Sequence, residues 1–135
     1  MYSLKEFPYS PWIYKNFYLP LHQQNMEDME LKNRKFKIFG QTWKLNFVDD
    51  IVLNSADGEE IHPKGTSNWE VSKIEIRKNS IEGKPFDEET IKISILHELM
   101  HALLDEGMFK DESQNEQLVE YLAKGVNSLL NQHVI

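Results

Sequence analysis

The clearest hydrophobic pattern in the chain lies in its C-terminal third, where apolar residues recur every four positions. Asp87 precedes this run and is a residue type that caps helix N-termini, while Gly107 follows it as a candidate C′ residue. The pattern therefore predicts an amphipathic helix from about Glu88 to about Glu106, with the repeat facing the core. The repeat consists of Ile91, Ile95, Leu99 and Leu103.

A second amphipathic segment follows after a short connection. Residues 111–117 are polar and open a second predicted helix, which continues to about residue 131. Because the loop between the two helices is short, they are expected to pack antiparallel. The apolar positions of the second helix are Leu118, Leu122, Val126 and Leu129, with Val119, Ala123 and Leu130 alongside.

Upstream of the helices, apolar and polar residues alternate with the period of a β-strand. Residues 36–47 alternate on both sides of Gly40-Gln41, where glycine at the first central position suits a type II′ turn. The predicted cross-strand pairs of this β-hairpin are Ile38 with Trp43 and Phe36 with Leu45, all on one face.

The next segments are less regular. Residues 49–68 are polar and predict a loop with a small strand at residues 51–53. The stretch from Trp69 to Arg77 alternates through Ile74 and Ile76 and predicts a further strand. We expect this strand, which directly precedes the first predicted helix, to lie at the sheet edge beside a cleft, where a peptide can add to it as an extra strand; Val71–Arg77 is the candidate.

The N-terminal 20 residues have a different composition. They contain seven aromatic residues and three prolines and follow neither a helical nor a strand period. We expect an arm that packs on the domain and completes its core; the alternative is an exposed patch for a partner or an oligomer. Residues 21–35 are polar and are a candidate short helix.

Length and composition limit the possible functions. At 135 residues the chain is expected to form one domain, comprising the N-terminal arm and candidate helix (1–35), a β-sheet region (36–77) and a pair of helices (87–131). The absence of cysteine fits a reducing compartment, and the sequence has neither a membrane-spanning apolar run nor a signal-peptide pattern, so we expect a cytoplasmic protein. A net charge of -7 argues against nucleic-acid binding and favours a neutral or basic protein partner.

The most informative chemical motif is His97-Glu98-Leu99-Met100-His101, an HExxH pattern inside the first predicted helix. Residues four apart lie one above the other on a helix, so the two imidazoles can bind one Zn²⁺ ion at ~2.0–2.1 Å each. Glu98 lies beside the pair, where it can take a proton from a metal-activated water. The motif predicts a zinc-dependent peptidase with Glu98 as the general base.

Catalytic zinc normally has three protein ligands, and the spacing leaves two candidates for the third. Glu116 and Glu120 lie one turn apart on the second helix. Depth along the helices slightly favours Glu120, because the histidine pair lies ~12 Å from its helix end while Glu116 lies ~4.5 Å and Glu120 ~10.5 Å along the next helix. Glu116 also fits a structural role, since Ser113-x-x-Glu116 has the form of a capping box.

A family resemblance bears on this choice. The motif followed by Asn115-Glu116-x-x-x-Glu120 resembles the gluzincin arrangement of thermolysin-like peptidases, and the region from Ile91 to Leu130 is similar to ImmA/IrrE-type metallopeptidases of phages and mobile elements. The resemblance implies Glu116 as the third ligand and Glu120 as a carboxylate that orients a histidine. The chain departs from the ImmA/IrrE pattern in having Glu120 where Asn or Asp is usual and in a shorter gap after the motif, so the choice remains open.

Together these features predict an α+β, minimal zincin-like fold, in which a small twisted sheet packs on the HExxH helix and an antiparallel second helix. The predicted function is hydrolysis of a protein or peptide, and the resemblance implies a regulatory protein as substrate. The alternatives are a zinc-binding scaffold without peptidase activity and a non-metal protein with an accidental motif. The remaining histidines, His22, His62 and His133, are isolated in polar context. The candidates for stabilising the oxyanion are His62, Tyr121 and His133, and the sequence does not select among them.

Overall fold

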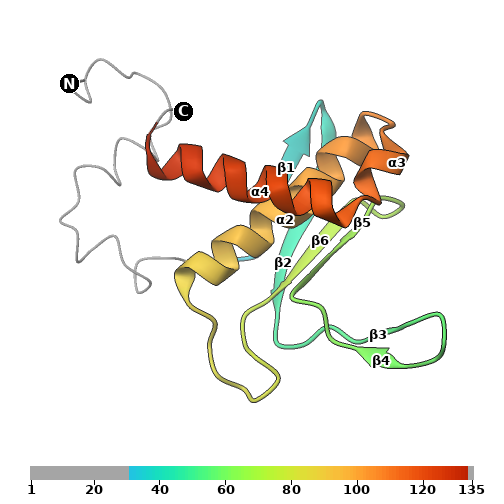
Figure 1. The fold of residues 1–135 in the computed structure, drawn as a ribbon, viewed down its shortest axis with the longest axis vertical. Coiled ribbons are helices and arrows are strands. Elements are labelled where there is room, and N and C mark those ends of the chain that lie inside the picture. Colours follow the sequence, from blue (N-terminus) through green and yellow to red (C-terminus); the bar gives the residue numbers. More distant parts are fainter. Residues whose placement is uncertain (1–30, 134–135) are drawn as a thin grey trace. The chain divides into compact units, whose positions relative to one another are not determined.

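The structure is a computed structural model that describes residues 31–133. A four-stranded sheet forms one layer and helices pack over one of its faces (Figure 1). The predictions for the N-terminal arm, for His22 and for most of the candidate helix at 21–35 lie outside the described residues; within them, residues 34 and 35 already belong to the first strand. The fold is α+β, as predicted.

The predicted hairpin is present, but its register differs from the prediction by two residues. Strands β1 (Arg34–Ile38) and β2 (Gln41–Val48) pair antiparallel with Phe36 opposite Trp43. Phe39 and Gly40 form the turn, with φ angles of 47° and 86°. Two positive φ angles are typical of a type I′ turn rather than the predicted type II′ turn. Because the shift is two residues, the same side chains still share one face and the buried face is unchanged.

The third and fourth strands of the main sheet follow much later in the chain. β6 (Lys73–Arg77) pairs parallel with β2, and β5 (Gly65–Asn68) pairs antiparallel with β6, which gives the order β1-β2-β6-β5. Two predictions were therefore wrong. The predicted loop at 49–68 contains a strand of the main sheet, and Val71–Arg77 is not an edge strand because β6 lies between β2 and β5.

The chain between β2 and β5 forms a short hairpin that projects from the main sheet (Figure 1). It consists of β3 (Leu53–Asn54) and β4 (Glu60–Ile61), which pair antiparallel with each other and form a separate two-stranded sheet. The predicted strand at 51–53 overlaps β3 only at Leu53.

Three helices follow the sheet: α2 (Glu88–Glu106), α3 (Lys110–Ser113) and α4 (Glu116–Asn131). Asp87 caps α2 by accepting a hydrogen bond from the Thr90 amide at 2.7 Å, as predicted. The second predicted helix is instead divided into α3 and α4. α4 runs back along α2, so that Lys92 near the start of α2 donates to Asn131 at the end of α4 (Figure 1).

Burial along α2 differs from the predicted stripe. Ile91 is buried, but Leu103, the last residue of the repeat, is 40% exposed. α2 contacts β5 and β6 on one side and α4 on the other, so its buried positions cannot form a single stripe. The buried residues of α2 are Ile91, Leu96, Glu98 and Ala102, and the buried residues of α4 are Val119, Ala123 and Asn127.

The end of α2 also differs in detail from the prediction. Gly107 is the C-cap with a φ of −81°, and the left-handed conformation belongs to the next residue, Met108, with a φ of 66°. A Cβ at Gly107 would lie 2.9 Å from the Phe109 ring, so that ring would have to move to admit a larger residue. The glycine therefore permits close packing of the chain as it turns into α3.

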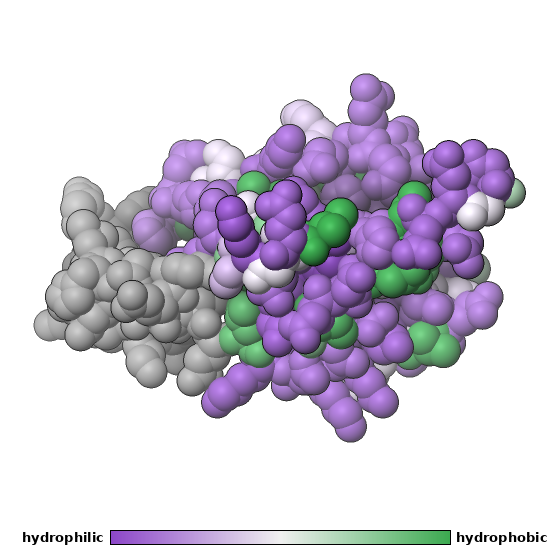
Figure 2. Space-filling model, turned by 90° about the horizontal axis from the view of Figure 1, so that it is seen from below, coloured by the Kyte–Doolittle hydropathy of each residue, from purple (hydrophilic) through white to green (hydrophobic). Residues whose placement is uncertain are grey.

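Within residues 31–133, none of the helices is both long and apolar enough to cross a membrane. The face drawn in Figure 2 is mostly hydrophilic, with hydrophobic side chains in separate small groups.

Candidate metal centre

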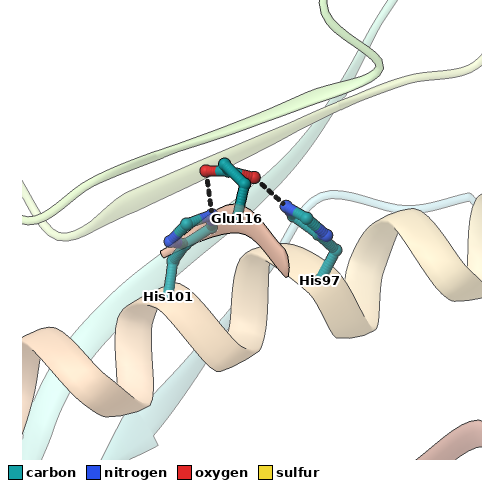
Figure 3. Close-up of side chains that lie close together, drawn as sticks. All are labelled: His97, His101 and Glu116. Atoms are coloured by element: carbon teal, nitrogen blue, oxygen red, sulfur yellow. Dashed lines mark hydrogen bonds and ion pairs between the residues drawn. The ribbon is translucent and has the colours of Figure 1, made fainter. Parts of the chain in front are cut away.

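Two histidines of α2 and the first residue of α4 converge on one point. The Glu116 carboxylate lies between the two imidazoles, with Oε2 at 3.0 Å from His97 Nε2 and Oε1 at 3.1 Å from His101 Nε2 (Figure 3). One ligand atom from each residue lies within 4.8 Å of those of the other two. The chain thus carries a His-His-Glu group that could hold a metal ion.

The outer nitrogen of each imidazole faces a second polar group. Ser113 Oγ lies 3.3 Å from His101 Nδ1, and the serine is buried, with 4% of its surface exposed. Glu120 Oε2 lies 3.7 Å from His97 Nδ1, a distance compatible with an ion pair. Contacts of this kind fix the orientation of each ring, so that both Nε2 atoms remain directed toward Glu116.

The start of α4 explains why Glu116, rather than Glu120, lies between the two Nε2 atoms. The cap of α4 is Asn115, whose side chain accepts a hydrogen bond from the Leu118 amide at 3.1 Å. Ser113 belongs to α3 and contacts His101, so the capping-box role considered for Glu116 is not observed. The depth comparison that favoured Glu120 counted residues along one continuous helix from Ser113, whereas the chain turns between α3 and α4.

Glu98 lies on the side of α2 that faces the sheet and is 7% exposed. Its side chain packs under the first residue of β5, because the position of a Cβ at Gly65 would be 3.2 Å from Glu98 Oε2. Burial raises the pKa of the Glu98 carboxyl to about 8, and the negative charge of Glu116 contributes to the rise. A cation bound at the triad would act in the opposite direction, since it favours the charged carboxylate.

The triad opens into a broad cleft between β5 and the helices. His97, Glu98, His101, Glu116 and Glu120 all line it, and all four residues of β5 form part of its wall. The lysines along the cleft are Lys64, Lys73, Lys110 and Lys124. The edge strand and the candidate metal ligands therefore face one common space.

His62 belongs to a second cluster; His62 itself does not line the cleft, although its partner Asp50 does. Its Nδ1 lies 3.0 Å from Asp50 Oδ1 and its Nε2 lies 3.2 Å from Glu60 Oε1. Buried Arg77 donates to the His62 carbonyl oxygen at 3.1 Å and lies 3.8 Å from Asp50. The hydrogen bond with Asp50 raises the pKa of His62 and lowers that of Asp50.

None of the three predicted oxyanion-stabilising residues lines the cleft. His62 is bound to two carboxylates, Tyr121 is 75% exposed on α4, and His133 lies beyond the end of α4. From the sequence, Ser113 was considered only as part of a possible capping box and Gly65 was not singled out, and both contact the motif, from α3 and β5. No local pattern marks them, because each acts through a contact between segments distant in sequence.

Among the described residues, His97, His101 and Glu116 form the one group of three or more His, Cys, Asp or Glu that meets the distance requirement for a shared metal ion. No protein-family model, curated protein or solved structure matches the chain.

Proposed function

We propose that the protein is a zinc-dependent peptidase. The observation that carries the proposal is the convergence of His97 Nε2, His101 Nε2 and the Glu116 carboxylate in an open cleft, with Glu98 beside them. Two imidazoles and one carboxylate, with space for substrate, are the ligand set of many catalytic zinc sites. The donors are nitrogen and oxygen only, which suits zinc better than a metal that demands thiolate ligands.

The side chains divide the catalytic work between them. Zinc, when bound, supplies the Lewis acidity that polarises the scissile carbonyl and lowers the pKa of the attacking water. Glu98 accepts the proton of that water and delivers it to the leaving amine. Its buried position favours this second step, because desolvation stabilises the protonated carboxyl that must act as the acid. Ser113 and Glu120 hold the two imidazoles in orientation.

The substrate is proposed to bind along β5 as an additional strand. The Arg77 amide donates to the Lys64 carbonyl oxygen at 2.8 Å, which fixes the alternation of hydrogen bonds between β5 and β6. In an antiparallel ladder, Thr66 and Asn68 then also bond to β6, while the N–H and C=O groups of Gly65 and Ser67 point to the open edge. A peptide can pair with these groups in the cleft, so a protein segment able to become extended is the proposed substrate.

By analogy with ImmA/IrrE-type proteins, which the helical region resembles in its motif residues, we propose a regulatory protein as the physiological substrate. This step rests on analogy between families and not on the geometry of the site.

The decisive variant is Glu98→Gln. Glutamine keeps the size of glutamate but cannot act as a base, so we expect one zinc per chain, an unchanged fold and a loss of peptide hydrolysis of ~10²–10⁴-fold. Zinc would be measured by elemental analysis after dialysis, and cleavage by comparing proteome digests made with wild type and variant.

Two results would overturn parts of the proposal. Identical cleavage products from both proteins would remove Glu98 from the mechanism. Zinc binding without products from wild type would instead favour a zinc-binding scaffold, which uses the same three ligands without turnover.

A further inference from the structure

We propose that Gly65 is a positioning residue for Glu98: the absence of a side chain on the edge strand creates the space in which the Glu98 carboxylate lies. The inference rests on the proposed peptidase function for its catalytic meaning. The packing relation on which it depends can be tested separately from that function.

The geometry requires glycine at this position for reasons of space. An ideal Cβ on Gly65 would lie 2.9 Å from Glu98 Cγ and 3.1 Å from Ile76 Cδ1. The φ of Gly65 is not in the left-handed region, unlike those of Gly40, Gly58 and Gly83. Contact with its neighbours, and not backbone conformation, therefore excludes larger residues.

The overlap falls on a part of Glu98 that cannot move without moving the carboxylate. Cγ is fixed by the first side-chain torsion, so displacing it means a change of rotamer or a shift of α2 away from β5. Ile76 cannot yield easily, because it is completely buried in the core. Either response changes the distance between the Glu98 carboxylate and the cleft.

Gly65 also belongs to the proposed substrate-binding edge, since its N–H and C=O groups point away from β6. One residue thus touches the general base on one side and presents backbone groups to the substrate on the other. The close approach at Gly65 therefore sets the distance between the bound peptide and the base.

The test is Gly65→Ala, with Gly125→Ala as the matched control. Gly125 lies in α4, where a Cβ would have no neighbour within 4 Å, so its replacement is expected to raise Tm by roughly 2–4 °C and leave turnover unchanged. Gly65→Ala is expected to lower kcat ~10²-fold, the cost of misplacing a reacting group by about 1 Å, with a smaller change in KM. Zinc stoichiometry should remain one per chain, because the atoms nearest to a Cβ at Gly65 belong to Glu98 and Ile76 and not to the three ligands.

A double-mutant cycle identifies the partner of Gly65 without an activity assay. Gly65→Ala should lower Tm in the wild-type background and lower it much less in a Glu98→Ala background, because the overlapping Cγ is then absent. Ile76→Val removes the other overlapping atom, Cδ1. If Gly65→Ala fails to fold, recovery of the fold in the double variant with Glu98→Ala still supports the proposal.

The outcomes separate this inference from the proposed function. Wild-type kcat in Gly65→Ala, or an equal loss of Tm with and without the Glu98 side chain, would overturn the positioning role. Recovery of kcat by Ile76→Val alone would assign the overlap to the core and would also overturn it. If wild type binds zinc but cleaves nothing, the peptidase proposal fails, while the Tm cycle still decides whether Gly65 holds Glu98.

Discussion

Of two histidine clusters in the described part of the chain, only one brings three potential ligand atoms close enough to share a metal ion. At the first, His97 and His101 direct the same ring atom, Nε2, toward a single carboxylate. At the second, both nitrogens of His62 are taken by different carboxylates, those of Asp50 and Glu60. In the first cluster two imidazoles share one carboxylate, whereas in the second a single imidazole lies between two carboxylates.

The two clusters also differ in the charged side chains around them. His62 lies between two carboxylates, and the buried Arg77 guanidinium lies 3.8 Å from Asp50, so positive charge is already supplied by the protein. The triad has Glu98 and Glu120 as further acidic neighbours, and a bound cation would offset their repulsion with Glu116. A histidine near carboxylates therefore predicts a metal site only when nitrogens of two imidazoles face the same carboxylate, as His97 and His101 face Glu116.

The largest expected effect is the loss of metal from the first cluster alone. His97→Ala removes one of two imidazole ligands and should abolish stoichiometric zinc binding after dialysis, whereas His62→Ala should retain one zinc per chain. Elemental analysis of both variants beside wild type measures this directly. Equal zinc content in wild type and His97→Ala would show that the ion binds elsewhere.

A smaller effect should distinguish the residues around the triad. Loss of Glu120 or Ser113, which contact the outer ring nitrogens, is expected to lower zinc affinity ~10–100-fold, the usual cost of losing a group that orients a ligand. Glu116→Ala should lower it further, because Glu116 lies against both Nε2 atoms. Competition with a zinc-binding dye gives all three constants. A greater loss in Glu120→Ala than in Glu116→Ala would exchange their proposed roles.

The smallest effect concerns stability at the second cluster. The Asp50 hydrogen bond raises the pKa of His62 in the folded protein. The stabilisation of the folded state by protonated His62 is therefore complete below the unfolded-state pKa near 6.5 and is lost as pH rises through the folded-state pKa. The lowered pKa of Asp50 likewise stabilises the folded state; this contribution is present above pH 3.8, the unfolded-state pKa, and is lost as pH falls through the folded-state pKa. His62→Gln should therefore lower Tm more at pH 5.5 than at pH 9. An equal difference at both values would mean that the ion pair contributes nothing.

The sequence predicted those elements whose signals are local. The bounds of α2 follow from Asp87 and the apolar repeat, and the hairpin follows from alternation around Gly40. β5 was missed because Gly-Thr-Ser-Asn carries no apolar alternation; it becomes a strand through pairing with β6. The pairing of β5 with β6 also makes β5 the edge strand of the sheet, and the edge strand could not be identified without the sheet order.

At the site, the spacing of His97 and His101 was sufficient to predict that their rings face the same point, since residues four apart lie on one side of a helix. The choice between Glu116 and Glu120 depended on where α4 begins, which Asn115 determines by capping it. The contact of Ser113 with His101 depends on the turn of α3 and has no signature in the local sequence.

The open edge of β5 has a consequence for self-association. An exposed strand edge can pair with the same edge of another copy, and long apolar edges lead to aggregation. β5 has only four residues, none of them a large apolar residue, and Lys64 directly precedes it. Two such edges would form few hydrogen bonds and bury little apolar surface, so we expect this edge to contribute little to pairing between copies of the chain.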